Sequence, residues 1–206
     1  MKINARQLNL YAVTDRSWLK PGETLVSVTE ELLKAGITCV QLREKHMSDE
    51  EILKEASLLK DLCDSYQVPL IINDRPDLAK KSGASGVHVG LSDMGIQKAR
   101  KLLGEDFIIG GSAHNVEEAL AAEAAGADYL GCGAVFGSTT QLPVETLKAI
   151  CKAVKIPVVA IGGVNSDNLP LLAGSGIAGA AVVSGLFKPT DKAAAVRRFL
   201  TQLKAI

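Results

Sequence analysis

The feature that most constrains the fold of this chain is a regular alternation of short apolar segments with longer amphipathic ones. The apolar segments have the length of buried strands, and the amphipathic segments repeat their apolar residues with the period of a helix. Eight strand-like segments occur, at residues 8–13, 37–42, 68–72, 86–89, 107–111, 129–133, 157–161 and 180–183. Eight helical segments alternate with them, at residues 25–35, 49–65, 77–82, 96–103, 116–125, 144–154, 166–173 and 193–203. The sequence therefore predicts eight consecutive β-α units.

Strict β-α alternation leaves two main arrangements, a closed (β/α)8 barrel or an open doubly wound sheet. Strands that are apolar at nearly every position are buried on both faces, as parallel strands covered by helices must be. The number of units, and the lack of a G-x-G-x-x-G motif after the first strand, favour the barrel. We therefore expect a single (β/α)8 TIM barrel over residues 1–206, with its functional residues at the C-terminal ends of the strands.

The composition excludes several kinds of partner. Lys plus Arg and Asp plus Glu balance at 23 each, so no overall field favours nucleic acid or a membrane surface. No apolar segment approaches membrane-spanning length, and no cationic stretch precedes an apolar core at the N-terminus. The four cysteines form no C-x-x-C pair, which predicts free thiols in a reducing compartment. The sequence thus indicates a cytoplasmic protein that acts on small molecules, and it carries no signal for an oligomeric state.

Charged and amide side chains follow the second strand-like segment. Period-2 alternation places Gln41, Arg43 and Lys45 on one side of this strand, while the residues between them face the helices. A planar Arg fork beside a compact Lys charge suits the oxygens of a polyphosphate. A solvated charge cluster paired through Glu44 is the alternative, and the spacing alone leaves both open.

Carboxylates follow the third and fourth strand-like segments. Asn73 and Asp74 end the third strand, and Asp93 comes shortly after the fourth. Two carboxylates at neighbouring strand ends suit Mg2+, which prefers oxygen ligands and keeps waters and substrate phosphates in its other positions. Its role would be to neutralise charge on a departing pyrophosphate. Alone, Asp74 is explained by a salt bridge to Arg75 and Asp93 by a helix cap, but together, beside two cations, they favour the metal.

Ser112 and His114 follow the fifth strand-like segment. Two glycines before Ser112 allow a ligand to approach the backbone, and the Ser112 hydroxyl can bind a phosphate oxygen. His114 is a candidate acid or base. However, Asn115 and Glu118 have the spacing of a capped helix start, which favours a structural role for His114. His88, inside the fourth strand, is expected to fill the barrel.

Hydroxyl-rich and glycine-containing loops follow the last three strands. Backbone N–H groups after the seventh and eighth strands form the recurrent phosphate pocket of this fold. These loops predict a monophosphate site that is separate from the charge cluster near strands two to five. Their candidate residues are Ser138, Thr139, Thr140, Gln141, Gly162, Gly163, Val183, Ser184 and Gly185.

With these segments in order, the chain resembles thiamine-phosphate synthases over nearly its whole length. The resemblance implies a (β/α)8 barrel that joins 4-amino-2-methyl-5-(diphosphooxymethyl)pyrimidine to a thiazole phosphate and releases pyrophosphate. It also implies a dissociative mechanism, in which pyrophosphate leaves before the thiazole nitrogen captures the pyrimidine-methyl cation. The matching stretches are Tyr11-Ala12-Val13-Thr14-Asp15, Val40-Gln41-Leu42-Arg43-Glu44-Lys45, Ile71-Ile72-Asn73-Asp74-Arg75, Gly86-Val87-His88-Val89-Gly90, Gly126-Ala127-Asp128-Tyr129 and Ala160-Ile161-Gly162-Gly163.

The resemblance also implies a role for each candidate residue. The pyrimidine diphosphate would be held by Gln41, Arg43, Lys45, Asn73 and Ser112, of which Arg43, Lys45 and Ser112 would be catalytic. Mg2+ would be bound by Asp74 and Asp93. The thiazole phosphate would be held by Ser138, Thr140, Gly163, Val183 and Ser184, and Thr139 and Gln141 complete the substrate-binding set.

The chain departs from the family pattern after the sixth strand. The family has Thr-x-Thr-Lys there, whereas this chain has Gln141 in place of the lysine and a loop several residues shorter. An Mg2+-dependent synthase is the leading hypothesis. A related thiazole tautomerase that uses His114 is one alternative, and a non-catalytic barrel that binds thiazole phosphate or thiamine phosphate is another. The groups at Asn73, Asp74 and Asp93, which an isomerase does not need, favour the synthase.

Overall fold

Parallel strands close into a barrel in the computed structural model, which describes residues 3–90 and 95–206. The strands follow one another around the barrel in sequence order, and the last pairs with the first. The predicted (β/α)8 barrel is confirmed. The strands are β1 Leu10–Val13, β2 Cys39–Leu42, β3 Leu70–Asn73, β4 Gly86–Val89, β5 Ile108–Ala113, β6 Tyr129–Cys132, β7 Val158–Ile161 and β8 Gly179–Val182.

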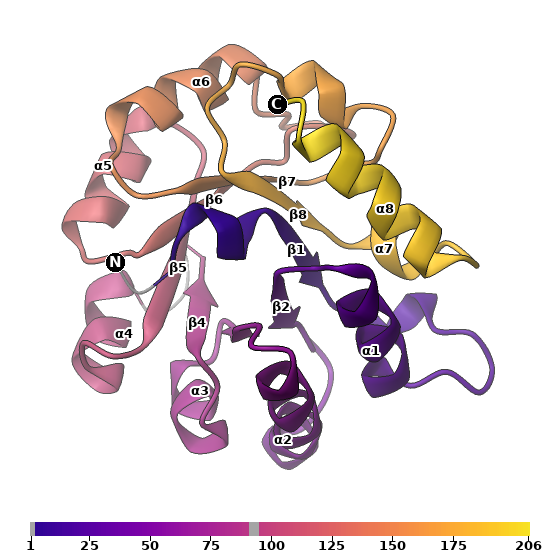
Figure 1. Cartoon of the computed structure of the whole chain (residues 1–206). Helices are drawn as coiled ribbons and strands as arrows, with labels where there is room; N and C mark the ends of the chain where they lie inside the picture. Colours follow the sequence, from indigo (N-terminus) through magenta and orange to yellow (C-terminus); the bar gives the residue numbers. More distant parts are fainter. Residues whose placement is uncertain (1–2, 91–94) are drawn as a thin grey trace.

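Helices surround the barrel, and the last long helix, α8, lies beside the first, α1 (Figure 1). Three short 3-10 helices accompany them: η1 Ala5–Leu8, η2 Arg16–Trp18 and η3 Leu169–Leu172. The α-helices are α1 Leu25–Ala35, α2 Asp49–Ser65, α3 Pro76–Ser82, α4 Ile96–Leu103, α5 Val116–Ala124, α6 Val144–Ala153, α7 Ser184–Phe187 and α8 Lys192–Leu203. Among the described residues, none of these helices combines the length and the apolar character that crossing a membrane requires.

Local side-chain chemistry determines where the helices begin and end. Ser48 caps α2 by accepting from the N–H of Glu51, whose carboxylate in turn accepts from the N–H of Ser48. Gly36 ends α1 with φ of 111°, a left-handed conformation that glycine adopts without steric cost. Such paired signals lie at the boundaries that the sequence predicts for these two helices.

The structure departs from the predicted elements in several places. The helix expected at residues 166–173 is the shorter η3, although the Asn165 side chain caps the segment by accepting from the N–H groups of Asp167 and Asn168. Pro170 has no N–H to donate to the carbonyl of Ser166, and its ring disfavours a regular α-helix across this position. The strand expected from residue 8 begins at Leu10, because Leu8 ends η1. The sequence does not predict α7, the single turn after β8.

Alternation along the strands separates two apolar layers. Val40 and Leu42 of β2 pack in the layer between the strands and the helices, as the period-2 pattern predicts. The barrel interior is filled by inward-facing residues such as Tyr11, Ile71 and Tyr129. Polar residues such as Gln41, Asn73 and Ser112 lie toward the C-terminal end of the barrel, and the packed interior forms the floor of a cavity there.

Candidate active site

A cavity of about 450 Å³ opens at the C-terminal end of the barrel. Most of the predicted diphosphate and metal residues line it, since they lie at or just after the C-terminal ends of β2, β3 and β5. Asp93 lies outside the described residues. The lining comprises Tyr11, Val13, Gln41, Arg43, Lys45, Asn73, Asp74, His88, Gly90, Ser112, Gly131, Val159, Ile161, Ala181 and Val183.

Thr14, directly after β1, fixes the backbone at the end of β2. Its hydroxyl is buried and accepts from the N–H of Arg43 at 2.9 Å. The N–H of Thr14 donates to the carbonyl of Gln41, also at 2.9 Å. These two bonds hold the end of β2 against the start of the loop after β1, and they determine where Gln41 and Arg43 enter the cavity.

The two cations after β2 are available to a ligand. Within residues 3–90 and 95–206, no carboxylate forms an ion pair with Arg43 or Lys45. Glu44 pairs with Arg16 at 3.2 Å, and Arg16 also binds Glu55 at 2.8 Å. The alternative of a cluster paired through Glu44 is therefore wrong, and the positive charge of the pair is directed at whatever occupies the cavity.

Asp74 occupies a strained position at the edge of the cavity. Its φ is 60°, in the left-handed region that costs a residue with a side chain about 1–3 kcal/mol. The N–H of Asp74 donates to the carbonyl of His88 at 2.8 Å, and its carboxylate accepts from the Asn73 amide at 2.6 Å. Neighbouring β4 and the preceding residue thus hold the carboxylate in place.

Arg75 has carboxylate partners on the outside of the barrel. Its guanidinium donates to both carboxylate oxygens of Asp49, at 2.7 and 2.8 Å, and to the carboxylate of Asp77 at 3.3 Å. These two carboxylates raise the pKa of Arg75. The Arg75 fork is therefore engaged by α2 and α3, and a salt bridge with Asp74 is not needed to explain either residue.

A continuous chain of polar contacts crosses the floor of the cavity. The Gln41 amide donates to the Tyr11 hydroxyl at 2.7 Å, and the Tyr11 hydroxyl lies 2.9 Å from that of Tyr129. Tyr129 contacts His88 Nδ1 at 3.1 Å, and His88 Nε2 lies 3.2 Å from the Ser112 hydroxyl. The barrel wall withdraws His88 from bulk water and lowers its pKa to about 4, so the imidazole is neutral at pH 7.

The sequence did not identify the polar role of Tyr11, His88 and Tyr129. His88 was predicted to fill the barrel, and it does so while also lining the cavity. The signal that was missed is strand parity. Each of these residues occupies an inward position of its strand, as Gln41 does on β2, and a polar group facing a barrel interior requires a partner.

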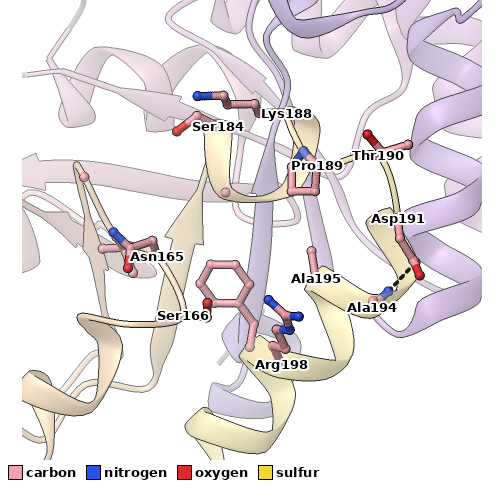
Figure 2. A pocket seen from close by; sticks show the side chains of 14 residues that line it. Asn165, Ser166, Ser184, Lys188, Pro189, Thr190, Asp191, Ala194, Ala195 and Arg198 are labelled. Atoms are coloured by element: carbon pink, nitrogen blue, oxygen red, sulfur yellow. Dashed lines mark hydrogen bonds between the residues drawn. The ribbon is translucent and has the colours of Figure 1, made fainter.

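A second cavity of about 730 Å³ lies between the loop after β7 and α8. Figure 2 shows Asn165 on one side of it and Arg198, which projects from α8, on the other. Gly163 and Ser184, predicted to bind a phosphate, line this cavity, whereas Val183 lines the barrel mouth. Three of the predicted phosphate residues are thus divided between two cavities, and the adjacent residues Val183 and Ser184 line different ones.

Gly163 is required by packing as well as by any ligand. Its φ is 65°, and a Cβ at this position would lie 2.3 Å from the carbonyl oxygen of Phe136. The loop after β7 therefore rests on the loop after β6. Only a residue without a side chain permits this approach.

The loop after β6 is bonded to itself. The Ser138 hydroxyl lies 3.3 Å from that of Thr140 and accepts from the N–H of Thr140 at 3.2 Å. All of Ser138, Thr139, Thr140 and Gln141 are exposed, and none of them lines either cavity. The structure therefore does not bring these four predicted residues together with the rest of the site.

His114 belongs to the start of α5. Its Nδ1 lies 3.0 Å from Glu118, and its N–H donates to the same carboxylate at 2.7 Å. Asn115 caps the helix through the N–H of Glu118. The predicted helix start at Asn115 and Glu118 is confirmed, and the exposed imidazole of His114 lines neither of the two cavities.

Comparisons with known proteins agree with this architecture. The profile of the family described as "Thiamine monophosphate synthase" matches residues 10–186. A thiamine-phosphate synthase of Clostridium acetobutylicum is 49% identical over 192 residues, covering 89% of this chain and 90% of the relative. Thiamine-phosphate synthase 2 of Streptococcus pneumoniae is 43% identical over 209 residues, covering 99% of each chain. A solved thiamine phosphate pyrophosphorylase from Pyrococcus furiosus is 36% identical, with a TM-score of 0.90 and 97% of each chain covered.

Proposed function

The chain belongs to the thiamine monophosphate synthase family and is a transferase, and we propose that it joins an aminopyrimidine-methyl diphosphate to a thiazole phosphate. The observation that supports this best is the pair Arg43 and Lys45 at the barrel mouth. Neither cation has a carboxylate partner among the described residues, and both line a cavity that also contains Asn73 and Asp74. This arrangement suits a small molecule with several anionic oxygens.

The donor set at the end of β3 suits Mg2+. Asp74 offers a hard carboxylate oxygen at the cavity edge, and Asp93 is the second carboxylate that the family resemblance suggests. Mg2+ commonly takes one or two protein carboxylates and completes its shell with waters and substrate phosphates. When bound there, it would neutralise charge on the diphosphate.

The proposed reaction is a substitution at the methylene carbon of the pyrimidine. The bond from this carbon to the diphosphate oxygen breaks, and pyrophosphate leaves with the bonding electrons. The thiazole ring nitrogen then donates its electron pair to the same carbon. Arg43, Lys45 and Ser112 would bind the diphosphate as its negative charge increases, and Gln41 would orient the ring. Such a reaction requires charge stabilisation and positioning rather than a protein nucleophile.

The thiazole phosphate is proposed to lie after β8, where adjacent residues line the two cavities. Val183 lines the barrel mouth and Ser184 the outer cavity, so a molecule at this junction can place its ring in the mouth and its phosphate outside. Gly163 lines the outer cavity beside Ser184. In this arrangement the single barrel supplies both substrate sites.

The test is formation of thiamine phosphate by the purified protein from both phosphorylated substrates, with Mg2+ and then with EDTA. We expect metal-dependent product, and we expect Asp74→Asn to reduce it by at least about tenfold without unfolding the barrel. Asp77→Asn is the matched control, since Asp77 lies three residues away and lines neither cavity. Full metal-dependent activity in Asp74→Asn would refute the metal assignment, and no product under any metal condition would refute the proposed function.

A further inference from the structure

The polar chain under the cavity connects two residues that the proposed function places on opposite parts of one substrate. It begins at Gln41 on β2 and ends at Ser112 on β5, and it passes through Tyr11, Tyr129 and His88. Tyr11 and Tyr129 are 1% and 0% exposed. Hydroxyl groups buried so deeply lose free energy unless each is hydrogen-bonded.

The barrel is built to accommodate this chain. A Cβ on Gly110 would lie 2.2 Å from Cζ of Tyr129 and 2.5 Å from Nδ1 of His88. A Cβ on Gly131 would lie 3.1 Å from Cε1 of His88. Both glycines sit in strands with ordinary φ values, so space rather than backbone freedom requires them. They leave the room in which the Tyr129 ring and the His88 imidazole meet.

The protons along the chain have one consistent direction. The Gln41 amide donates to Tyr11, so the Tyr11 proton points to Tyr129, and the Tyr129 proton points to Nδ1 of His88. An imidazole that accepts at Nδ1 from Tyr129 carries its proton on Nε2, and the acceptor there is Ser112. If Tyr129 instead donated to Tyr11, the Tyr11 hydroxyl would have to donate to the nearby sulfur of Cys39, which is a weak acceptor.

This direction determines what each end presents to the cavity. The carboxamide oxygen of Gln41 has no hydrogen-bond partner among the described residues, so it is an acceptor for a ligand. The Ser112 hydroxyl already accepts from His88, so its own proton is free to be donated. Gln41 can therefore accept a hydrogen bond from a ligand, and Ser112 can donate one.

We propose that Tyr11, Tyr129 and His88 are positioning residues that fix the hydrogen-bonding direction of Gln41 and Ser112, and thereby select an amino-bearing ring joined to an anionic group. This rests on the proposed function. An exocyclic amine donates to the Gln41 oxygen, whereas a ring carbonyl in its place would set two acceptors against each other. To accept the carbonyl, the Gln41 amide must turn over. The whole chain then reverses, and Ser112 must donate to His88 rather than to the anion.

The test compares two substrates, the 4-amino pyrimidine-methyl diphosphate and the analogue with a 4-oxo group. The measured quantity is the ratio of their kcat/KM values in the wild type, Tyr129→Phe and Tyr11→Phe. Each variant removes one hydroxyl and keeps the aromatic ring. The Gln41 side-chain amide can then rotate by 180° without any change in the donor and acceptor roles of His88 and Ser112. We expect the preference for the amino ring to fall by about tenfold or more in each variant. In the wild type the oxo ring leaves polar groups of the site without a hydrogen-bond partner, and each variant removes this penalty.

Tyr66→Phe is the matched control, since Tyr66 ends α2 outside the barrel and lines neither cavity. A general loss of stability would reduce both kcat/KM values together and leave the ratio unchanged. A ratio unchanged in both Tyr11→Phe and Tyr129→Phe would overturn this proposal alone, whereas a wild type inactive on both rings would overturn the proposed function.

A second measurement does not depend on turnover. In the wild-type protein labelled with ¹⁵N-histidine, the proposed direction requires the Nε2–H tautomer of His88, and His88→Asn identifies its resonances. The opposite tautomer, with the proton on Nδ1, would overturn the proposed direction even if the enzyme were inactive.

Discussion

Replacing Arg43 by lysine tests the proposed role of its planar fork. The substitution keeps the positive charge and removes the ability to bind two phosphate oxygens in parallel. A charge-assisted hydrogen bond contributes about 1.5–3 kcal/mol, so losing one bond of the fork lowers kcat/KM about 10- to 150-fold. Because Arg43 is half-buried and partly screened, we expect the lower part of this range. The assay is steady-state kinetics with varied pyrimidine diphosphate at saturating thiazole phosphate.

The same substitution at Arg16 is the control for this prediction. Arg16 lies beside the cavity without lining it, and it binds Glu44 and Glu55. Arg16→Lys should therefore leave kcat/KM unchanged within error. Arg43 has no ion pair within the described part of the chain, so Arg43→Lys should change the free energy of unfolding by no more than about 0.5 kcal/mol. Equal kinetics in the two variants, or a large loss of stability in Arg43→Lys, would refute the reasoning.

Two further predictions concern stability. Asp128→Asn should lower the free energy of unfolding in urea by about 1.5–3 kcal/mol, because the carboxylate accepts from Arg100 at 2.7 Å and from the N–H of Ile109 at 2.8 Å. An unchanged urea midpoint would contradict this. The hydrogen bond from Lys192 lowers the pKa of Glu23. The unfolded state therefore binds the Glu23 proton more tightly, and the stability contributed by this pair is present above the unfolded pKa and lost as pH falls through the folded pKa. Thermal unfolding of Lys192→Met should depend less steeply on acid pH than that of the wild type, and parallel profiles would contradict the assignment.

The regular part of the fold was predictable because its signals are local. Strand length, helical period and caps such as Ser48 determine most elements without reference to the rest of the chain. The helix expected at residues 166–173 was wrong because Pro170 cannot donate a backbone hydrogen bond within it, and the apolar periodicity alone does not take this into account.

The candidate site was predictable to the extent that it follows strand ends. Gln41, Arg43, Asn73 and Ser112 converge because the C-terminal ends of parallel strands meet in a barrel. The sequence does not predict which of these polar groups already bind other residues of the protein. Arg75 is held by Asp77 of its own helix start and by Asp49 of α2, and the contact with Asp49 depends on how α2 packs beside α3.

The barrel core and the proposed site are parts of one hydrogen-bonded system. Tyr11 and Tyr129 belong to the apolar interior, yet their hydroxyl groups are satisfied only through contacts that end at Gln41 and Ser112. An apolar residue at position 41 would leave the Tyr11 hydroxyl without its donor, and in the proposed function it would also remove a ligand contact. If the proposal holds, stability and substrate selection depend on the same inward-facing positions.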